Sequence, residues 1–432
     1  MLKRLDVRGV PIAELRNRLP KPIVAGDEPV AAVREILAAV EARGDAAVRE
    51  YTERFDRVRL EQLRVPPEAV RAALDQIDPT VRAALEAAAV EIEAFQRSTL
   101  VAPHNHTADG VTIRSWRQPV ARAGCYVPGG RAIYPSTVLM TAIPAKVAGV
   151  GEVVLCVPPE RGTGTVPAVT LAAAAVAGVD EVYAIGGAQA IGALAFGTES
   201  IRAVDVIVGP GNVYVAVAKR EVAGRGLVAI PSAFAGPSEV VVIADETVPA
   251  EFAAIDVIVQ AEHGPDGLAW LVCWSDPVAD AVGAAIERLV ETAPRRAEIL
   301  STLDLNGYAV VCDDAAQAVE VANVIAPEHL ELLCGAAVAE VGRVRNAGAI
   351  FLGPHAPASV GDYAAGPSHT LPTDGSARFS SVLSVDDFTK HMHTIEVDPA
   401  GFERLAPHVV ALARAEGFDA HASSITLRQA AR

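Results

Sequence analysis

The sequence contains few cysteines and no close pair of them. Five occur in 432 residues, widely spaced, and no CxxC motif is present. This pattern argues against a small disulfide-stapled secreted domain and against a CxxC redox or zinc motif. We therefore predict reduced thiols in the protein core at Cys125, Cys156, Cys273, Cys312 and Cys334.

The sequence also lacks a long apolar run and an excess of positive charge. No stretch reaches the roughly 18 to 20 apolar residues that a spanning helix needs. The N-terminus MLKRLDVRGV is basic but has no apolar signal-peptide core. The formal net charge is −16, with 53 acidic residues spread along the chain, which argues against nucleic acid or anionic lipid as a partner. We predict a cytoplasmic protein that acts on a small molecule.

Common catalytic and nucleotide motifs are missing too, since GxGxxG, GxxxxGK and GxSxG do not occur. Two glycine-rich turns take their place, IGGAQA at Ile185–Ala190 and VGPGNVY at Val208–Tyr214. Each follows a strand-like run and opens a helical one, so backbone N–H groups could face a pyrophosphate there. A tight connection without a ligand fits these turns equally well.

The composition is that of an ordinary globular protein, with 51% hydrophobic and 21% charged residues. At 432 residues the chain is long enough for two or three domains. From Pro29 to Glu93, apolar residues recur three and four positions apart, which predicts an N-terminal helical region. The alternating segment Val111–Pro119 predicts strands.

After Gly124 the chain alternates short β-rich runs with helical ones, as in VVLCVPP followed by VPAVTLAAAAVAGV. A second series begins at SEVVVIAD and includes helices near Val278–Thr292 and Ala315–Ile325. Such alternation is typical of parallel sheets covered by helices. We predict an α/β fold of two tandem doubly wound, Rossmann-like units, with a site in the crevice between them.

Two later segments are expected to differ from this pattern. Gly361–Ser384 is rich in Gly, Pro, Ser, Thr and Asp, and we predict a functional loop there. The final segment, from Gly401 onward, is expected to form a helix, a turn and a short strand.

Polar side chains that could bind a metal or take part in catalysis occur in two predicted elements. Gln260 and His263 are three residues apart near the end of a predicted helix, where they could share a metal or could simply be solvated. Glu328 and His329 follow Pro327, which fits a helix start. The same pair would suit an alcohol oxidation, as a base near neutral pH beside a carboxylate that activates water.

The loop GDYAAGPSHTLPT adds Asp362 and His369, and the tail AEGFDAH adds Glu416 and His421. A terminal histidine taken alone is usually a surface residue. As a set, however, Gln260, His263, Asp362 and His421 provide mixed oxygen and nitrogen donors that suit a borderline cation such as Zn²⁺.

Ten ordered motifs together resemble the L-histidinol dehydrogenase family, and they run from about residue 120 to the C-terminal region. They are YVPGG at Tyr126, YPSTVLM at Tyr134, GGAQAIGALAFGT at Gly186, GPGN at Gly209, GPSEVVVIAD at Gly236, QAEHGPD at Gln260, PEHLEL at Pro327, AGAIFLG at Ala347, GDYAAGPSHTLPT at Gly361 and EGFDAH at Glu416.

The resemblance implies an intertwined homodimer in which the C-terminal segment reaches the partner subunit. We expect four parts: an N-terminal helical region, 1–119, that packs on the second α/β unit; a first α/β unit, 120–236, that binds NAD; a second unit, 237–385, with the zinc and catalytic residues; and a C-terminal segment, 386–432.

The resemblance also assigns the site. One zinc per subunit would be bound by Gln260, His263, Asp362 and His421, with His421 supplied by the partner. The substrate-binding residues would be Ser238, Gln260, His263, His329, Asp362, Glu416 and His421. The NAD contacts would be Tyr126, Gln189 and Asn212.

The implied reaction converts L-histidinol to L-histidine through an aldehyde, with two NAD molecules and one water, while zinc holds the substrate imidazole and amine. We hypothesise that His329 takes the alcohol proton and acts again as base in the second oxidation, and that Glu328 helps water add to the aldehyde. Two alternatives are a related zinc and NAD dehydrogenase that oxidises another small polar alcohol, and a catalytically silent scaffold. Retention of Ser238, His329 and Glu416 disfavours both.

Three positions depart from what is common in the family. Ala358 replaces a usual Glu, Ser368 a usual Asn, and His391 a usual Lys or Arg. The missing carboxylate at Ala358 would remove a possible contact to the substrate amine. The proposed zinc and proton-transfer residues are all present.

Overall fold

The computed structural model describes residues 2–20, 29–129, 132–231, 236, 238–264 and 267–431. It divides into two compact units, each described here by itself. Unit 1 comprises Met1–Thr99 and Val120–Phe388, and unit 2 comprises Leu100–Pro119 and Thr389–Arg432.

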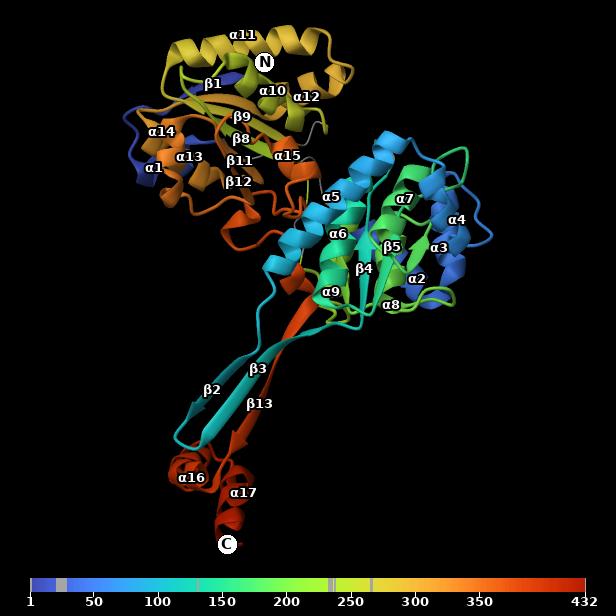
Figure 1. Ribbon diagram of the computed structural model, residues 1–432, viewed down its shortest axis with the longest axis vertical. Helices are drawn as coiled ribbons and strands as arrows, with labels where there is room; N and C mark the ends of the chain where they lie inside the picture. The colour runs from blue at the N-terminus through green and yellow to red at the C-terminus, as the bar shows by residue number, and fades with distance from the viewer. Residues whose placement is uncertain are drawn as a thin grey trace. The chain divides into compact units, whose positions relative to one another are not determined.

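The first sheet of unit 1 has four parallel strands in the order β6-β5-β4-β7 (Figure 1). These are β4 (Arg122–Tyr126), β5 (Glu152–Cys156), β6 (Glu181–Tyr183) and β7 (Val206–Val208). They alternate with α6 (Pro135–Ala148), α7 (Ala168–Val176), α8 (Gly187–Phe196) and α9 (Val213–Gly224). The strands are short apolar runs because helices cover both of their faces. The first predicted α/β unit is confirmed.

The N-terminal helices pack on this first sheet, so their expected place on the second unit is wrong. They are α2 (Val30–Arg43), α3 (Asp45–Asp56), α4 (Pro67–Ala72) and α5 (Pro79–Ser98), with the 3₁₀ turn η1 (Ala73–Asp75). Helix α2 buries Val33, Ile36, Leu37 and Val40, a stripe of helical period, in one core with Ile191. Helices α2 and α3 contact α8, whereas α4 and α5 contact α7.

The second sheet has six parallel strands in the order β1-β10-β9-β8-β11-β12. They are β1 (Lys3–Asp6), β8 (Glu239–Ile243), β9 (Leu268–Cys273), β10 (Gly307–Val311), β11 (His329–Leu332) and β12 (Ala349–Leu352). Only β1 and α1 of the N-terminal region join this unit. Residue 237, the expected start of the second unit, lies outside the described residues.

Helices cover both faces of the second sheet as well. They are α1 (Ile12–Arg18), α10 (Ala250–Ala261), α11 (Asp276–Glu291), α12 (Arg296–Asn306), α13 (Ala315–Ile325), α14 (Gly335–Ala339) and α15 (Ala358–Tyr363), with 3₁₀ turns η2 (Val341–Arg343) and η3 (Ser376–Arg378). The 3₁₀ turn η4 (Val385–Phe388) instead contacts α6, and its Phe388 joins the core of the first sheet. Helices α10 to α12 share one core with the sheet, and α1, α13 and α14 share the other. The predicted loop from 361 is therefore wrong at its start, because α15 continues to Tyr363.

Unit 2 is a small antiparallel sheet with two helices. It contains β2 (His104–Ala108), β3 (Val111–Pro119), β13 (Thr389–Val397), α16 (Pro399–Ala415) and α17 (Asp419–Ala430), with strand order β13-β3-β2. Strand β3 confirms the strand predicted at Val111–Pro119. The tail forms two helices, so the expected final strand is wrong.

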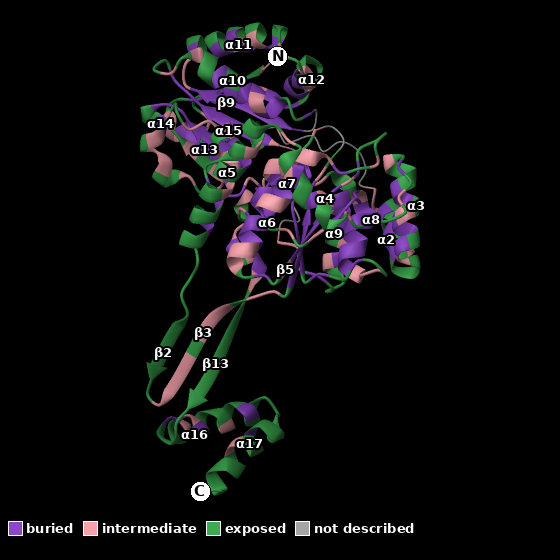
Figure 2. Ribbon diagram, turned by 45° about the vertical axis from the view of Figure 1, so that its right-hand side comes forward, coloured by how far each residue is buried: buried purple, intermediate pink, exposed green. Residues whose placement is uncertain are grey.

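Unit 2 leaves several apolar side chains uncovered, and its strands β2 and β13 and helices α16 and α17 are mostly exposed (Figure 2). Ile395, Leu412, Phe418 and Leu427 are each more than half exposed. The buried residues of α16 and α17 are only Gly401, Ala406, Ala413 and Ala422. An area this apolar on so small a unit is typical of an interaction surface.

Two sequence predictions concern the chain as a whole. All five cysteines are free and buried, as predicted. No helix among the described residues is long and apolar enough to cross a membrane.

Candidate active site

The proposed NAD residues of unit 1 lie where strands of the four-stranded sheet end. Tyr126 is the last residue of β4, Gln189 lies in the first turn of α8 after β6, and Asn212 precedes α9 after β7. Strand order reverses between β4 and β7, and this carboxyl edge is where open α/β sheets bind ligands. The structure thus brings Tyr126, Gln189 and Asn212 to one edge.

Two of these three side chains form hydrogen bonds with the turns at that edge. The Tyr126 hydroxyl accepts a hydrogen bond from Gly187 N at 3.1 Å. Asn212 caps α9, because its Oδ1 accepts from Tyr214 N and Val215 N. Gln189 is buried, and neither its Oε1 nor its Nε2 has a partner within the described part of the chain. A buried amide without partners fits a site that a polar ligand completes.

The turn after β7 approaches β4 very closely. A side chain at Gly209, whose φ is +105°, would place its Cβ 2.0 Å from Tyr126 O. Behind the turn, the buried Lys219 donates from Nζ to Gly209 O. Burial lowers the pKa of Lys219 to about 7. This edge therefore contains a buried amine and two helix N-termini, all of which favour an anion such as a pyrophosphate.

His329 begins β11 and is almost fully buried. Its Nδ1 donates to the carbonyl oxygen of Glu239 at 3.0 Å, because a carbonyl can only accept. Its Nε2 lies 3.1 Å from Asp362 Oδ1. Burial alone would lower the pKa of His329, but the charge of Glu328 and the hydrogen bond to Asp362 outweigh it and raise this pKa well above its usual value.

Asp362 is the point where the site elements converge. Its Oδ2 accepts from Gln260 Nε2 at 3.4 Å, at the end of α10, as the helical spacing predicted. Burial raises the pKa of Asp362, but His329, with weaker contributions from His369 and His263, lowers it below its usual value. Gln260 Oε1 is buried with no partner in the described chain, so an oxygen donor is available to a cation beside the Asp362 carboxylate.

His369 ties this site to the first sheet. Its Nδ1 donates to Asp362 O at 2.8 Å, which leaves Nε2 of the neutral ring to accept from Thr137 Oγ1 at 3.0 Å. Burial lowers the pKa of His369, which favours the neutral ring. Ser368 adds a second tie, from its Oγ to Met140 O at 3.0 Å. These contacts hold the Asp362 segment against α6.

Glu328 and Glu239 exchange hydrogen bonds at the start of β11 and β8. Glu239 N donates to Glu328 Oε2 at 2.8 Å, and Glu328 N donates to Glu239 Oε2 at 3.2 Å. Burial raises the pKa of Glu239 to about 8, and the charges of Asp374 and Glu328 act in the same direction. Pro327 precedes a strand, so the helix start considered for this motif is wrong.

A second buried acid pair lies one layer deeper. Glu331 is fully buried on β11, and the Asp256 carboxyl of α10 lies near enough to act on its pKa. Glu331 Oε1 also accepts from Ala358 N at 2.7 Å, at the start of α15. Burial, then the neighbouring Asp256, raises the pKa of Glu331 to about 9. One carboxyl therefore joins the three elements that carry His329, Gln260 and Asp362.

The remaining site predictions are only partly assembled. His263 is exposed two residues beyond α10, close enough to Asp362 for its charge to act there. Ser238 is half-buried just before β8. Glu416 and His421 are exposed in unit 2, whose placement relative to unit 1 is not determined. Within the described residues no three His, Cys, Asp or Glu side chains lie close enough to hold a metal ion.

Sequence reasoning missed three contributors, namely Glu239, the Asp256–Glu331 pair and the bridging role of His369. Glu239 and Glu331 lie in strands among apolar residues. A charged residue in such a strand is normally predicted to face the solvent. The one available signal was a carboxylate inside a run that is otherwise fully apolar, since buried carboxylates need a specific partner. Ala358, where the family usually has Glu, is itself buried and begins α15.

This arrangement is suited to proton transfer beside a bound cation. One imidazole nitrogen is fixed by a backbone carbonyl, and the other faces the site, which is the geometry of a general acid or base. The edge with Tyr126, Gln189 and Asn212 belongs to the four-stranded sheet, and the cluster around His329 belongs to the six-stranded sheet. His369 links the two parts, because it contacts both Asp362 and Thr137.

Comparisons with known proteins agree on one family. The family model described as "Histidinol dehydrogenase" matches residues 21–429. The histidinol dehydrogenase of Moorella thermoacetica is 46% identical over 96% of this chain and 98% of its own length. That of Parasynechococcus marenigrum is 49% identical over 91% and 89%. A crystal structure of histidinol dehydrogenase from Elizabethkingia anophelis is 34% identical, with a TM-score of 0.94 over 100% of this chain and 98% of that one.

Proposed function

The chain belongs to the histidinol dehydrogenase family and is an oxidoreductase of histidine biosynthesis, and from this premise we propose how its residues carry the reaction. The reaction oxidises L-histidinol twice, through the aldehyde, to L-histidine, with one water consumed. The observation that carries the assignment is the buried His329, held by Glu239 O at Nδ1 and facing Asp362 at Nε2.

His329 is the general base of both oxidations. Its Nδ1 proton is committed to a backbone carbonyl, so Nε2 is the atom that exchanges protons: it first loses the proton that it shares with Asp362, and it then receives one from the alcohol and later from the hydrated aldehyde. Two carboxylates near the ring stabilise the imidazolium that forms.

Glu328 assists the addition of water to the aldehyde. Its Oε2 lies 3.4 Å from His329 Nδ1 and accepts from Glu239 N, so the carboxylate is fixed beside the base. A fixed carboxylate can take a proton from water as the new C–O bond forms. The resulting hydrate is the substrate of the second oxidation.

Gln260, His263, Asp362 and His421 would hold one zinc ion. The unpartnered Gln260 Oε1 beside Asp362 supports this set, because it provides a free oxygen donor at a helix C-terminus. Zinc would hold the substrate through its imidazole and amine. Unit 1 supplies only two ligands of the common types, His263 and Asp362, so the set depends on His421.

Tyr126, Gln189 and Asn212 would hold NAD, which accepts the hydride in each oxidation. The unpartnered Gln189 amide and the helix N-termini of α8 and α9 support this position. The buried Lys219 beneath Gly209 adds an amine at the same edge.

We further propose a homodimer in which unit 2 of each subunit packs on the partner and supplies Glu416 and His421 to its substrate site. The exposed apolar residues of unit 2 support this assembly, since burying Ile395, Leu412 and Leu427 against a second copy is favourable. Ser238 would contact the substrate within its own subunit. Five free, buried thiols fit a cytoplasmic location.

The test is the number of NADH molecules formed per histidinol consumed by the purified protein in excess NAD, with and without a strong chelator. We expect two NADH per histidinol, loss of activity with the chelator and recovery with Zn²⁺. Activity that survives complete metal removal would contradict the zinc site. Turnover of a different alcohol, with none of histidinol, would overturn the assignment of substrate.

A further inference from the structure

Glu239 is a buried carboxyl that the proposed chemistry does not use. It is the first residue of β8 and only 3% exposed, yet it touches both proposed catalytic residues. We propose that Glu239 is a positioning residue, whose carboxyl group holds the start of β11 so that Glu328 and His329 stay aligned with the substrate. This inference rests on the proposed function.

The contacts of Glu239 explain how it would act. Strands β8 and β11 are parallel neighbours, and their pairing begins at Val240 and His329. Beyond that point the ladder ends, and Glu328 N would lack a strand partner. The Glu239 carboxylate supplies one, since its Oε2 accepts from Glu328 N and its Oε1 accepts from Asp374 N at 3.0 Å.

The backbone of Glu239 acts on the other catalytic group. Its carbonyl oxygen accepts from His329 Nδ1, and its N–H donates to Glu328 Oε2. One residue thus fixes the tautomer of the base, the orientation of the carboxylate and the main chain between them. Only the acceptor for Glu328 N and Asp374 N belongs to the side chain, so a substitution removes that function alone.

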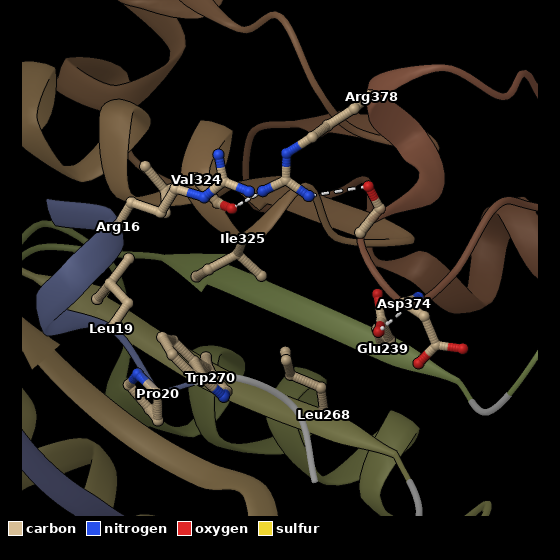
Figure 3. Close-up of a pocket in the computed structure, with 11 residues that line it drawn as sticks. Arg16, Leu19, Pro20, Glu239, Leu268, Trp270, Val324, Ile325, Asp374 and Arg378 are labelled. Atoms are coloured by element: carbon tan, nitrogen blue, oxygen red, sulfur yellow. Dashed lines mark hydrogen bonds between the residues drawn. The ribbon is translucent and has the colours of Figure 1, made fainter. Parts of the chain in front are cut away.

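A pocket of about 210 Å³ reaches Glu239 from outside the catalytic cluster (Figure 3). Glu239 and Asp374 lie toward one end of it, and Arg16 and Arg378 lie toward the other. Leu19, Trp270 and Ile325 contribute apolar lining. The volume exceeds that of a formate ion, and two arginines favour an anion. A small carboxylate should therefore reach the space that a truncated Glu239 leaves.

The experiment compares Glu239→Ala with Glu239→Gln in the full-length dimer, with and without formate. We expect kcat for both oxidations to fall by about 10²-fold in Glu239→Ala with KM for histidinol nearly unchanged, as for a misplaced catalytic group. Formate should raise the kcat of Glu239→Ala at least tenfold. Glu239→Gln keeps one acceptor oxygen and the volume, so its loss should be about tenfold, with little response to formate.

Glu320→Ala is the matched control, because it removes another buried carboxylate that pairs with Arg345 away from the site. Its kcat should stay near the parent value and should not respond to formate. If Glu239→Ala does not fold, the rate of Glu239→Gln decides alone. An unchanged kcat in either Glu239 variant would overturn the proposal, and so would a folded, slow Glu239→Ala that formate does not restore.

The same assays on Glu328→Gln and His329→Asn separate this inference from its premise. If those two variants oxidise histidinol at the parent rate, the proposed catalytic roles fail whatever Glu239 does. If they are slow and Glu239→Ala is fast, only the positioning role fails.

Discussion

The two sheets of unit 1 share a doubly wound topology but present their proposed functional residues at opposite ends of their strands. In the four-stranded sheet, Tyr126, Gln189 and Asn212 follow the carboxyl ends of strands. In the six-stranded sheet, Glu239 and His329 begin their strands, and Gln260 lies at the end of α10, which leads back to that amino edge. One kind of scaffold therefore supports two different sites.

The difference follows from the helix ends that each edge presents. The carboxyl edge of the first sheet faces the N-termini of α8 and α9, where the helix dipoles favour an anion. The amino edge of the second sheet faces the C-terminus of α10, where the helix dipole favours a cation. The helix ends alone would therefore favour a nucleotide at the first sheet and a metal at the second sheet.

The largest effect is expected from loss of the proposed base at the amino edge of the six-stranded sheet. His329→Asn removes the group proposed to take the alcohol proton, so kcat of both oxidations should fall by about 10³-fold. Steady-state rates with histidinol and with the aldehyde measure this loss. His355→Asn, at an exposed histidine of the same unit, should keep the parent rate. A loss confined to one of the two oxidations would contradict a shared base.

The next effect separates the two oxidations. Glu328→Gln should slow the second oxidation by about 10²-fold and the first much less, because only the second requires water to add. NADH formed per histidinol at early times should then approach one, with aldehyde detectable by trapping. Equal slowing of both steps would assign Glu328 to orientation of His329 instead.

The pair Asp256–Glu331 should give the second sheet a characteristic pH dependence of stability. The folded state raises the pKa of Glu331 from 4.5 to about 9, so it binds more protons than the unfolded state between these values. The pair's contribution is complete below pH 4.5 and is lost as pH rises toward 9. The free energy of unfolding relative to Glu331→Gln should fall across that window, and a difference that does not change with pH would contradict the raised pKa of Glu331.

Lys219 should give the first sheet the opposite slope. Burial lowers its pKa from 10.5 to about 7, so the unfolded state binds more protons between these values. Relative to Lys219→Met, the free energy of unfolding of the parent should therefore rise from pH 7 to about 10.5. Denaturant titrations at fixed pH values measure the difference. A difference that does not change with pH would mean that Lys219 stays charged across this range.

The smallest effect concerns the unpartnered amide of Gln189. Gln189→Leu should raise the free energy of unfolding of the NAD-free protein by about 1 kcal/mol, because it removes a buried polar group without partners. It should weaken NAD binding by about tenfold. Gln317→Leu is the contrast, since that buried amide is hydrogen-bonded to Val7 O and Asp313 N and its loss should destabilise. Unchanged NAD affinity in Gln189→Leu would move the cofactor elsewhere.

The sequence predicted elements whose apolar pattern is local. Helix α13 was expected at Ala315–Ile325 and occurs there, and Gln260 lies at a helix end as its spacing indicated. Strand β1 was missed because its four residues are mostly charged and pair with β10, about 300 residues away. Glu331 was missed because its burial depends on Asp256, which no local pattern reveals.

A stopped-flow titration with NAD tests the division between the two edges most directly, because it reports the hydride-transfer rate and the NAD dissociation constant together. His329→Asn and Gln189→Leu would be compared in a single turnover of histidinol. The account predicts a much slower rate with unchanged NAD affinity for His329→Asn, and weaker NAD affinity with a nearly normal rate at saturation for Gln189→Leu. A His329 variant that binds NAD weakly but transfers hydride at the parent rate would contradict it.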